Sequence, residues 1–154
     1  MNKNLLIASN NTTDAKGIED AFCKAEGIRV LPSVYTGRDA MDMIFARDVD
    51  ILILDLFLHD LDGICVLDFI GKLGEDRRPL VFLTTAVADD RLLSIVKDRV
   101  LYCFTKPLKF ETIQLRVLEF LGCASAKRKP PTRRWTFWRA RLLPVSGQSA
   151  CLRI

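Results

Sequence analysis

Three polar residues with complementary chemistry stand where apolar runs end: Asp55, Thr85 and Lys106. Asp55 follows the unbroken apolar run 51–54, which is typical of a strand covered on both faces of a sheet. A carboxylate can attack phosphorus as a nucleophile, an ammonium binds phosphoryl oxygens, and a hydroxyl can hydrogen-bond one of them. These residue types predict a site that handles an anion. Taken singly, they could instead be a turn-capping aspartate, a helix-capping threonine and a surface lysine.

Five apolar segments alternate with five amphipathic segments along residues 1–122. The expected strands are 5–8, 28–34, 50–55, 80–84 and 100–104, and the expected helices are 14–26, 38–46, 64–73, 89–97 and 110–121. Pro32 suits an edge strand, and Gly27 and Gly122 are expected to stop the first and last helices. The alternation predicts an α/β fold with a doubly wound, five-stranded parallel sheet of flavodoxin-like type.

The carboxyl ends of parallel strands share one edge of a sheet, and open α/β sheets bind their ligands there. The residues that end the five expected strands therefore determine which ligand this edge can bind. The first strand ends in Ser9 and Asn10, and the others bring Asp55, Thr85 and Lys106 to the same edge. We expect one carboxylate, one or two hydroxyls and one lysine to converge at this place.

Charge divides the chain of 154 residues into two parts. Segment 123–154 carries eight basic residues and no acidic one, which leaves 15 basic against 19 acidic residues in 1–122. We therefore expect a folded domain over 1–122 and an irregular basic tail over 123–154 that contains aromatic residues. The tail has two readings: a disordered extension, or a segment that binds nucleic acid or anionic lipid.

The cysteines, the hydropathy and the spacing of reactive residues exclude several classes of protein. The five cysteines are scattered without a CxxC pair, so neither a zinc site nor a disulfide framework is expected. No apolar stretch reaches the length of a membrane span. A reducing, cytoplasmic location fits this pattern best. No nucleophile–base pair outside the strand-end site suggests an enzyme acting on a small molecule.

The ordered set of strand-end motifs resembles the receiver domains of two-component response regulators over about residues 3–121. Finer likeness, to the receiver of the sporulation master regulators, lies in segments 34–40 and 61–67. The motifs that carry the family resemblance are Ile51-Leu52-Ile53-Leu54-Asp55, Leu61-Asp62-Gly63, Leu83-Thr84-Thr85-Ala86 and Phe104-Thr105-Lys106-Pro107.

The resemblance implies a role for each matching residue. Asp55 would be the phosphoacceptor, Thr85 the hydroxyl that follows the phosphoryl group, and Lys106 its cationic partner, with a cis peptide bond before Pro107. The implied partner is a histidine kinase or a phosphotransfer protein, and a homodimer is compatible with the resemblance. The implied biological role is phosphorelay signalling, linked to the control of sporulation transcription.

Two acidic residues that the family uses to hold magnesium are replaced here by Ser9 and Asn10. Magnesium prefers oxygen ligands and usually carboxylates. A weakened Mg²⁺ site could use Asp55, the Phe57 carbonyl and the Asn10 amide oxygen. Asn11 and Asp14 are not expected to take the place of the missing acids, because the chain turns into a helix there. Poor autophosphorylation follows from this difference.

The switch region, formed by Thr85, Cys103 and Tyr102, also departs from the family. The aromatic residue that the family places three positions before the lysine is Cys103, with Tyr102 beside it. Phe57 and Val87 are apolar where polar residues often assist hydrolysis, which predicts slow dephosphorylation. The alternative to a phosphorelay receiver is a degenerate receiver that serves as a phosphate-independent interaction module.

Overall fold

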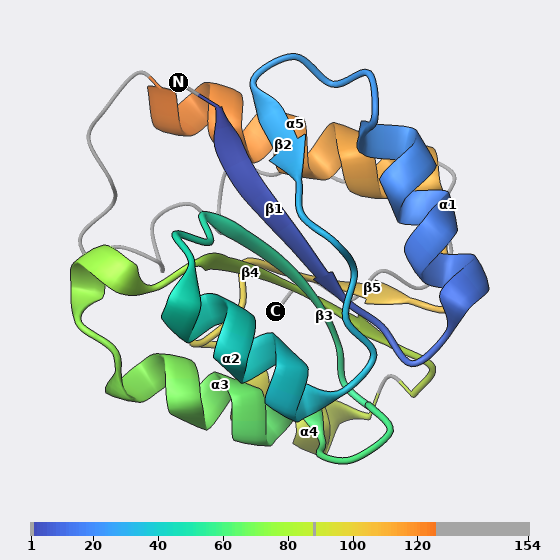
Figure 1. Cartoon of the computed structure of the whole chain (residues 1–154). Coiled ribbons are helices and arrows are strands. Elements are labelled where there is room, and N and C mark those ends of the chain that lie inside the picture. The colour runs from blue at the N-terminus through green and yellow to red at the C-terminus, as the bar shows by residue number, and fades with distance from the viewer. Residues whose placement is uncertain (1, 88, 126–154) are drawn as a thin grey trace.

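The computed structural model describes residues 2–87 and 89–125. A five-stranded parallel sheet forms its centre, as the alternation of segments predicted, and the strand order is β2-β1-β3-β4-β5 (Figure 1). The central strand, β3, is buried along its whole length. The strands are β1 (Lys3–Ala8), β2 (Ile28–Val30), β3 (Ile51–Asp55), β4 (Leu80–Thr85) and β5 (Tyr102–Thr105).

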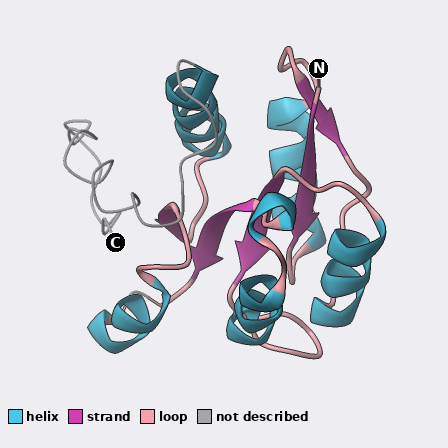
Figure 2. Cartoon of the chain, turned by 90° about the vertical axis from the view of Figure 1, so that its left-hand side faces the viewer, coloured by secondary structure: helices cyan, strands magenta, loops and turns pink. Residues whose placement is uncertain are grey.

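Five α-helices cover the two faces of the sheet (Figure 2). The helices are α1 (Thr12–Phe22), α2 (Gly37–Ala46), α3 (Gly63–Lys72), α4 (Asp90–Val96) and α5 (Phe110–Ser125), and a 3₁₀ turn η1 spans Glu75–Arg77. Helices α1 and α5 pack on one face, whereas α2, α3 and α4 pack on the other. None of the described helices combines the length and the apolar character that a bilayer span requires.

Alternation along β3 divides the core between the two faces. Ile51 and Ile53 pack with residues of α1 and α5, while Leu52 and Leu54 pack with residues of α2, α3 and α4. All four side chains are essentially inaccessible to solvent. This double burial explains why the strand is apolar without alternation, and it leaves Asp55 as the polar end of a rigid element.

Several boundaries differ from the expected ones. Helix α1 ends at Phe22 and not at residue 26, because the chain turns before Gly27, whose φ of 76° favours glycine. Strand β2 has only three residues, and beyond Pro32 only an isolated bridge joins Ala8 to Val34. Helix α5 continues past Gly122 to Ser125, and the turn η1 was not predicted.

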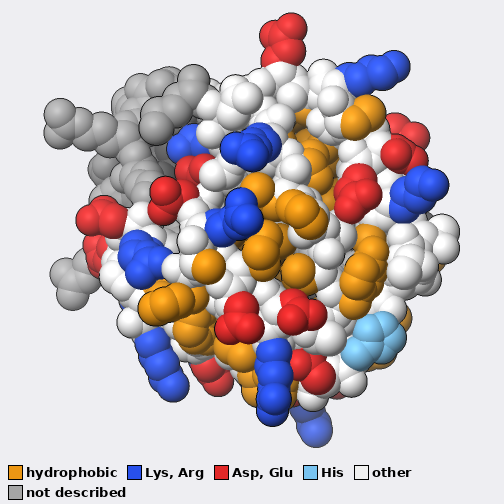
Figure 3. Space-filling view, viewed as in Figure 1, with side chains coloured by type: hydrophobic (Ala, Val, Ile, Leu, Met, Phe, Trp, Pro, Cys, Tyr) orange, Lys and Arg blue, Asp and Glu red, His pale blue; other side chains and the backbone are white. Residues whose placement is uncertain are grey.

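Charged side chains of both signs surround the apolar ones on the face viewed in Figure 3. This mixture matches the near balance of charge over 1–122 and is the usual surface of a folded domain. The expected basic tail, apart from residues 123–125 at the end of α5, lies outside the described residues. The proposed division at 122/123 therefore stays a prediction.

Candidate functional site: a carboxylate and a lysine at the carboxyl edge of the sheet

The site is built around a contact between the ends of two strands that are not neighbours in the sheet. The Nζ atom of Lys106 lies 2.6 Å from Oδ2 of Asp55, although the two residues are 51 positions apart. Asp55 ends β3 and Lys106 follows β5, with β4 between them. The Asp55 side chain is only 1% exposed and that of Lys106 is 19% exposed. The edge therefore holds a carboxylate–ammonium pair that is largely shielded from water.

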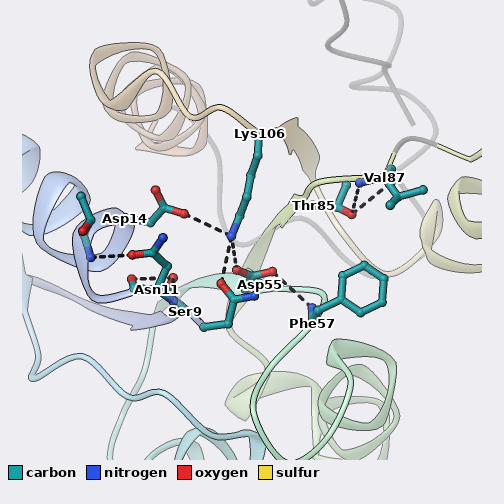
Figure 4. Close-up of polar contacts among 10 residues, drawn as sticks. Ser9, Asn11, Asp14, Asp55, Phe57, Thr85, Val87 and Lys106 are labelled. Carbon is teal, nitrogen blue, oxygen red and sulfur yellow. Dashed lines mark hydrogen bonds and ion pairs between the residues drawn. The ribbon is translucent and has the colours of Figure 1, made fainter.

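Two more oxygens complete the surroundings of the ammonium (Figure 4). Lys106 also donates to Oδ1 of Asn10 at 3.1 Å, and it forms an ion pair with Oδ2 of Asp14 at 3.1 Å. Asp14 lies in the first turn of α1, which Asn11 caps through its side-chain oxygen. Asp14 was not expected to replace the missing acids, and in the structure its side chain reaches the Lys106 ammonium from the first turn of α1.

The environment of Lys106 favours its charged form. Burial by itself lowers the pKa of this lysine, but hydrogen bonds and charges from Asp55 and Asp14 outweigh burial, so its pKa is raised from the ordinary 10.5. The geometry points the same way, since a carboxylate at 2.6 Å is a charge-assisted hydrogen bond. Lys106 is therefore a permanent cation in this site at neutral pH.

Asp55 also fulfils the simpler role of a turn residue. Its Oδ1 accepts a hydrogen bond from the backbone N–H of Phe57 at 3.2 Å, while its Oδ2 faces Lys106. The turn contact holds the carboxylate plane in place and does not replace the ion pair. Asp55 is therefore at once a turn residue and the ion-pair partner of Lys106.

The loop after Asp55 is held by close backbone packing and by capping. Asp62 caps α3 by accepting from the N–H of Cys65 at 3.0 Å. Gly63 begins α3 so close to the strand that an added Cβ would lie 2.9 Å from the carbonyl oxygen of Asp55. Asp60 accepts from the N–H groups of Gly37 and Arg38, which ties the same loop to the start of α2. Asp62 is thus explained by the start of α3, and Gly63 by the close approach of α3 to the end of β3.

The residues at the end of β1 do not fit a magnesium site built on carboxylates. The Ser9 hydroxyl is engaged with the backbone of Asn11, at 3.2 Å to both its oxygen and its nitrogen. The Asn10 oxygen and Asp55 Oδ2 both face the Lys106 ammonium. Among residues 2–87 and 89–125, no group of three or more His, Cys, Asp or Glu side chains is arranged to hold a metal ion. Receiver domains generally bind Mg²⁺ at an acidic site, and this edge lacks the matching set.

Thr85 lies at the same edge, but its hydroxyl is turned towards its own loop. Its Oγ1 donates to the carbonyl oxygen of Val87 at 3.0 Å and accepts from the N–H of Val87 at 3.1 Å. The backbone carbonyl of Thr85 accepts from the N–H of Lys106 at 2.8 Å, so the two residues are joined through the main chain. Figure 4 shows the Thr85 side chain pointing away from the carboxylate. The peptide bond between Lys106 and Pro107 is cis, as the resemblance implied.

The other two residues of the expected switch region do not share one environment. Cys103 is buried with residues of α4, including Leu93 and Val96. Tyr102 is buried on the opposite face, where its ring lies 4.7 Å from that of Phe104 and under the guanidinium of Arg116. Of these two residues, Cys103 therefore lies on the face of the sheet that α4 covers and Tyr102 does not.

The comparisons with known proteins agree with this fold. A family profile described as response regulator receiver domain matches residues 5–118. The signal receiver domain of a Luxo-repressor-type protein from Vibrio parahaemolyticus is 26% identical, with a TM-score of 0.72, over 82% of this chain and 95% of that one.

Two further solved structures share the fold at lower identity. A CheY-like response regulator receiver domain from Methanospirillum hungatei is 17% identical, with a TM-score of 0.72, over 82% of this chain and 98% of that one. The response regulator domain of Thermotoga maritima CheB is 16% identical, with a TM-score of 0.68, over 84% of this chain and 100% of that one. Because the profile covers most of the sequence, the chain belongs to the response regulator receiver domain family.

Proposed function

We propose that this receiver domain accepts a phosphoryl group on Asp55 and thereby acts in two-component or phosphorelay signalling. The observation that carries the proposal is the ion pair between Asp55 and Lys106, which places a permanent cation 2.6 Å from the acceptor oxygen. In the proposed step a carboxylate oxygen of Asp55 attacks the phosphorus of the donor. The bond between phosphorus and the donor atom breaks, and its electron pair leaves with the donor.

The donor in the proposal is a histidine kinase or a phosphotransfer protein, the classes with which receiver domains interact. Lys106 would attract the charge of the phosphoryl group. Thr85 would exchange its contacts with Val87 for one phosphoryl oxygen through a change of its χ1 rotamer, which moves Oγ1 towards Asp55. The domain would thus transmit a signal and would not turn over a small-molecule substrate. A role in sporulation transcription belongs to the proposal on the strength of segments 34–40 and 61–67 alone.

The test is phosphorylation of the full chain with acetyl phosphate, read by intact mass. We expect the gain of one phosphoryl group in the unaltered protein and none in Asp55→Asn, which keeps the size of the side chain but removes the nucleophile. A gain of equal size in Asp55→Asn would place the phosphoryl group elsewhere. No gain after long incubation would contradict the proposal.

The second candidate function is a phosphate-independent interaction module. The observation that favours it lies at the end of β1, where the family has two acidic residues. Here the Ser9 hydroxyl is hydrogen-bonded to the backbone of Asn11, and the Asn10 side chain accepts a hydrogen bond from Lys106. A protein of this kind would bind its partner equally well before and after treatment with acetyl phosphate. Homodimer formation and nucleic-acid binding by the tail stay predictions.

A further inference from the structure

Asp14 is a site residue that the strand-end pattern does not include. It comes from the first turn of α1, and its Oδ2 lies 3.1 Å from Nζ of Lys106. The side chains of Asp14 and Lys106 are each only 19% exposed, so solvent screens this pair less than an ion pair on the open surface. Figure 4 shows Asp14 and Asp55 approaching the ammonium from different elements.

Three side-chain oxygens surround the Lys106 ammonium, two of them as hydrogen-bond acceptors and the third as an ion-pair partner. A lysine ammonium has three N–H groups. The oxygens within reach are Oδ2 of Asp55 at 2.6 Å, Oδ1 of Asn10 at 3.1 Å and Oδ2 of Asp14 at 3.1 Å. A phosphoryl group on Asp55 would bring further oxygens to the same ammonium and would compete with these three for it.

The charges of the cluster also oppose an incoming anion. Asp55 and Asp14 are two carboxylates that share the single ammonium of Lys106, which leaves one negative charge in excess. Within the part of the chain that the structure describes, no second lysine or arginine forms an ion pair with either carboxylate. Replacing Asp14 by a neutral residue would leave the cluster uncharged before the reaction.

We propose that Asp14 restrains phosphorylation of Asp55, because it competes with the phosphoryl group for the Lys106 ammonium. This inference rests on the proposed function and deepens it. Asp14 is a positioning residue in this scheme, since it acts through Lys106 and does not contact the reacting phosphorus. It holds Lys106 in the arrangement of the unphosphorylated site. A kinase must offset this contact, whereas a small phosphodonor reacts slowly.

The test compares rates of phosphorylation by acetyl phosphate for the full chain, followed by intact mass in EDTA and again in magnesium. Asp14→Asn keeps a hydrogen-bond acceptor and removes the charge. We expect it to raise the rate roughly threefold to tenfold, with a gain that shrinks as salt is added. Asp14→Glu restores the charge and should restore the slow rate. Asp20→Asn, on the exposed side of the same helix, matches the change in net charge and should leave the rate unaltered.

The proposal would be overturned if Asp14→Asn reacted no faster than the unaltered protein in both EDTA and magnesium. A lower rate than that of the unaltered protein in magnesium alone would also overturn it. Equal acceleration by Asp14→Asn and Asp14→Glu would show that packing, and not charge, is responsible. Failure of the proposed function would be distinguishable, because no variant would then gain a phosphoryl group that depends on Asp55.

The contact between Asp14 and Lys106 is checked by NMR titration of the Lys106 Nζ. Its pKa should fall in Asp14→Asn and stay constant in Asp20→Asn, and an unchanged pKa in Asp14→Asn would contradict the competition.

Discussion

Tyr102 and Cys103 are adjacent in β5, yet their side chains lie on opposite faces of the sheet. The Tyr102 ring packs with Phe104 and Arg116 on the side of α1 and α5, and the Cys103 thiol packs on the side of α4. Alternation along a strand makes this inevitable. A ring at position 102 therefore cannot replace an aromatic residue at position 103.

Tyr102 is expected to contribute to stability and not to phosphoryl acceptance. Tyr102→Ala removes a ring that is 7% exposed and should lower the free energy of unfolding by about 3 kcal/mol. Leu115→Ala, at a side chain that is 51% exposed, should change it by no more than about 0.5 kcal/mol. Urea unfolding measures both. Because Tyr102 packs among residues of α1 and α5, the folded fraction of Tyr102→Ala should react with acetyl phosphate at the unaltered rate. A large loss of this rate would contradict the prediction.

Lys106 and Asp55 should be energetically coupled. Lys106→Met leaves the nearly inaccessible carboxylate of Asp55 without its ammonium, and we expect a loss of about 2–3 kcal/mol in the free energy of unfolding. In the background of Asp55→Asn the same change should cost at least about 1 kcal/mol less. A double-mutant cycle by urea unfolding at neutral pH gives the coupling, and strictly additive losses would show that the pair contributes nothing.

Asp60 should make the acid side of the stability curve steeper. Desolvation raises the pKa of its carboxyl group, but hydrogen bonds from the N–H groups of Gly37, Arg38 and Leu61 outweigh desolvation, so the pKa is lowered from 3.8. A lowered pKa means that Asp60 stabilises the fold above pH 3.8, and that this contribution disappears as the pH falls through the lower folded value.

The measurement compares Asp60→Asn with the unaltered protein by urea midpoint at several pH values. The difference between the two proteins should be constant near neutrality and should narrow in acid. Asp76→Asn in the turn η1 provides an exposed aspartate for comparison. If the difference for Asp60→Asn stayed the same down to the lowest pH, the carboxylate would not be the group that holds the start of α2.

Gly63 and Gly71 offer a matched pair within one helix. A Cβ at Gly63 would lie 2.9 Å from the Asp55 carbonyl oxygen and 3.0 Å from Cα of Leu56, so Gly63→Ala must displace backbone. We expect a loss of about 1–3 kcal/mol. Gly71 has nothing within 4 Å of an added Cβ, and Gly71→Ala should raise the free energy of unfolding by about 0.5–1 kcal/mol. Thermal or urea unfolding distinguishes them, and equal effects would refute the close approach.

Phe57 should slow the loss of a phosphoryl group from Asp55. Its side chain is 49% exposed beside the acceptor, where it offers water no hydrogen-bond partner. Phe57→Gln supplies such a partner and should speed hydrolysis roughly tenfold, the effect of one well-placed hydrogen bond. Phe45→Gln changes another exposed ring, on α2, and serves as the control. Decay of the phosphorylated mass after removal of acetyl phosphate gives the rates; equal decay in both variants would exclude shielding.

The parallel sheet and the convergence of Asp55 and Lys106 at its edge could be predicted, because the carboxyl ends of buried parallel strands meet at one edge. The position of Asp14 could not, since the reach of a side chain from a helix depends on the angle at which α1 leaves the sheet. The end of α5 was missed for a local reason. Gly122 has no structural need for a positive φ, and a glycine can continue a helix whose other residues favour it.

The central place of β3 has a consequence for the time scales of this protein. Because β3 is paired on both sides and covered on both faces, its amide hydrogens should exchange with solvent only through global unfolding. The N–H of Phe57, just beyond β3, donates to the Asp55 side chain instead of to a neighbouring strand, so it should exchange through local opening. The acceptor is thus anchored to the slowest-exchanging part of the molecule, at its boundary with a segment that exchanges faster.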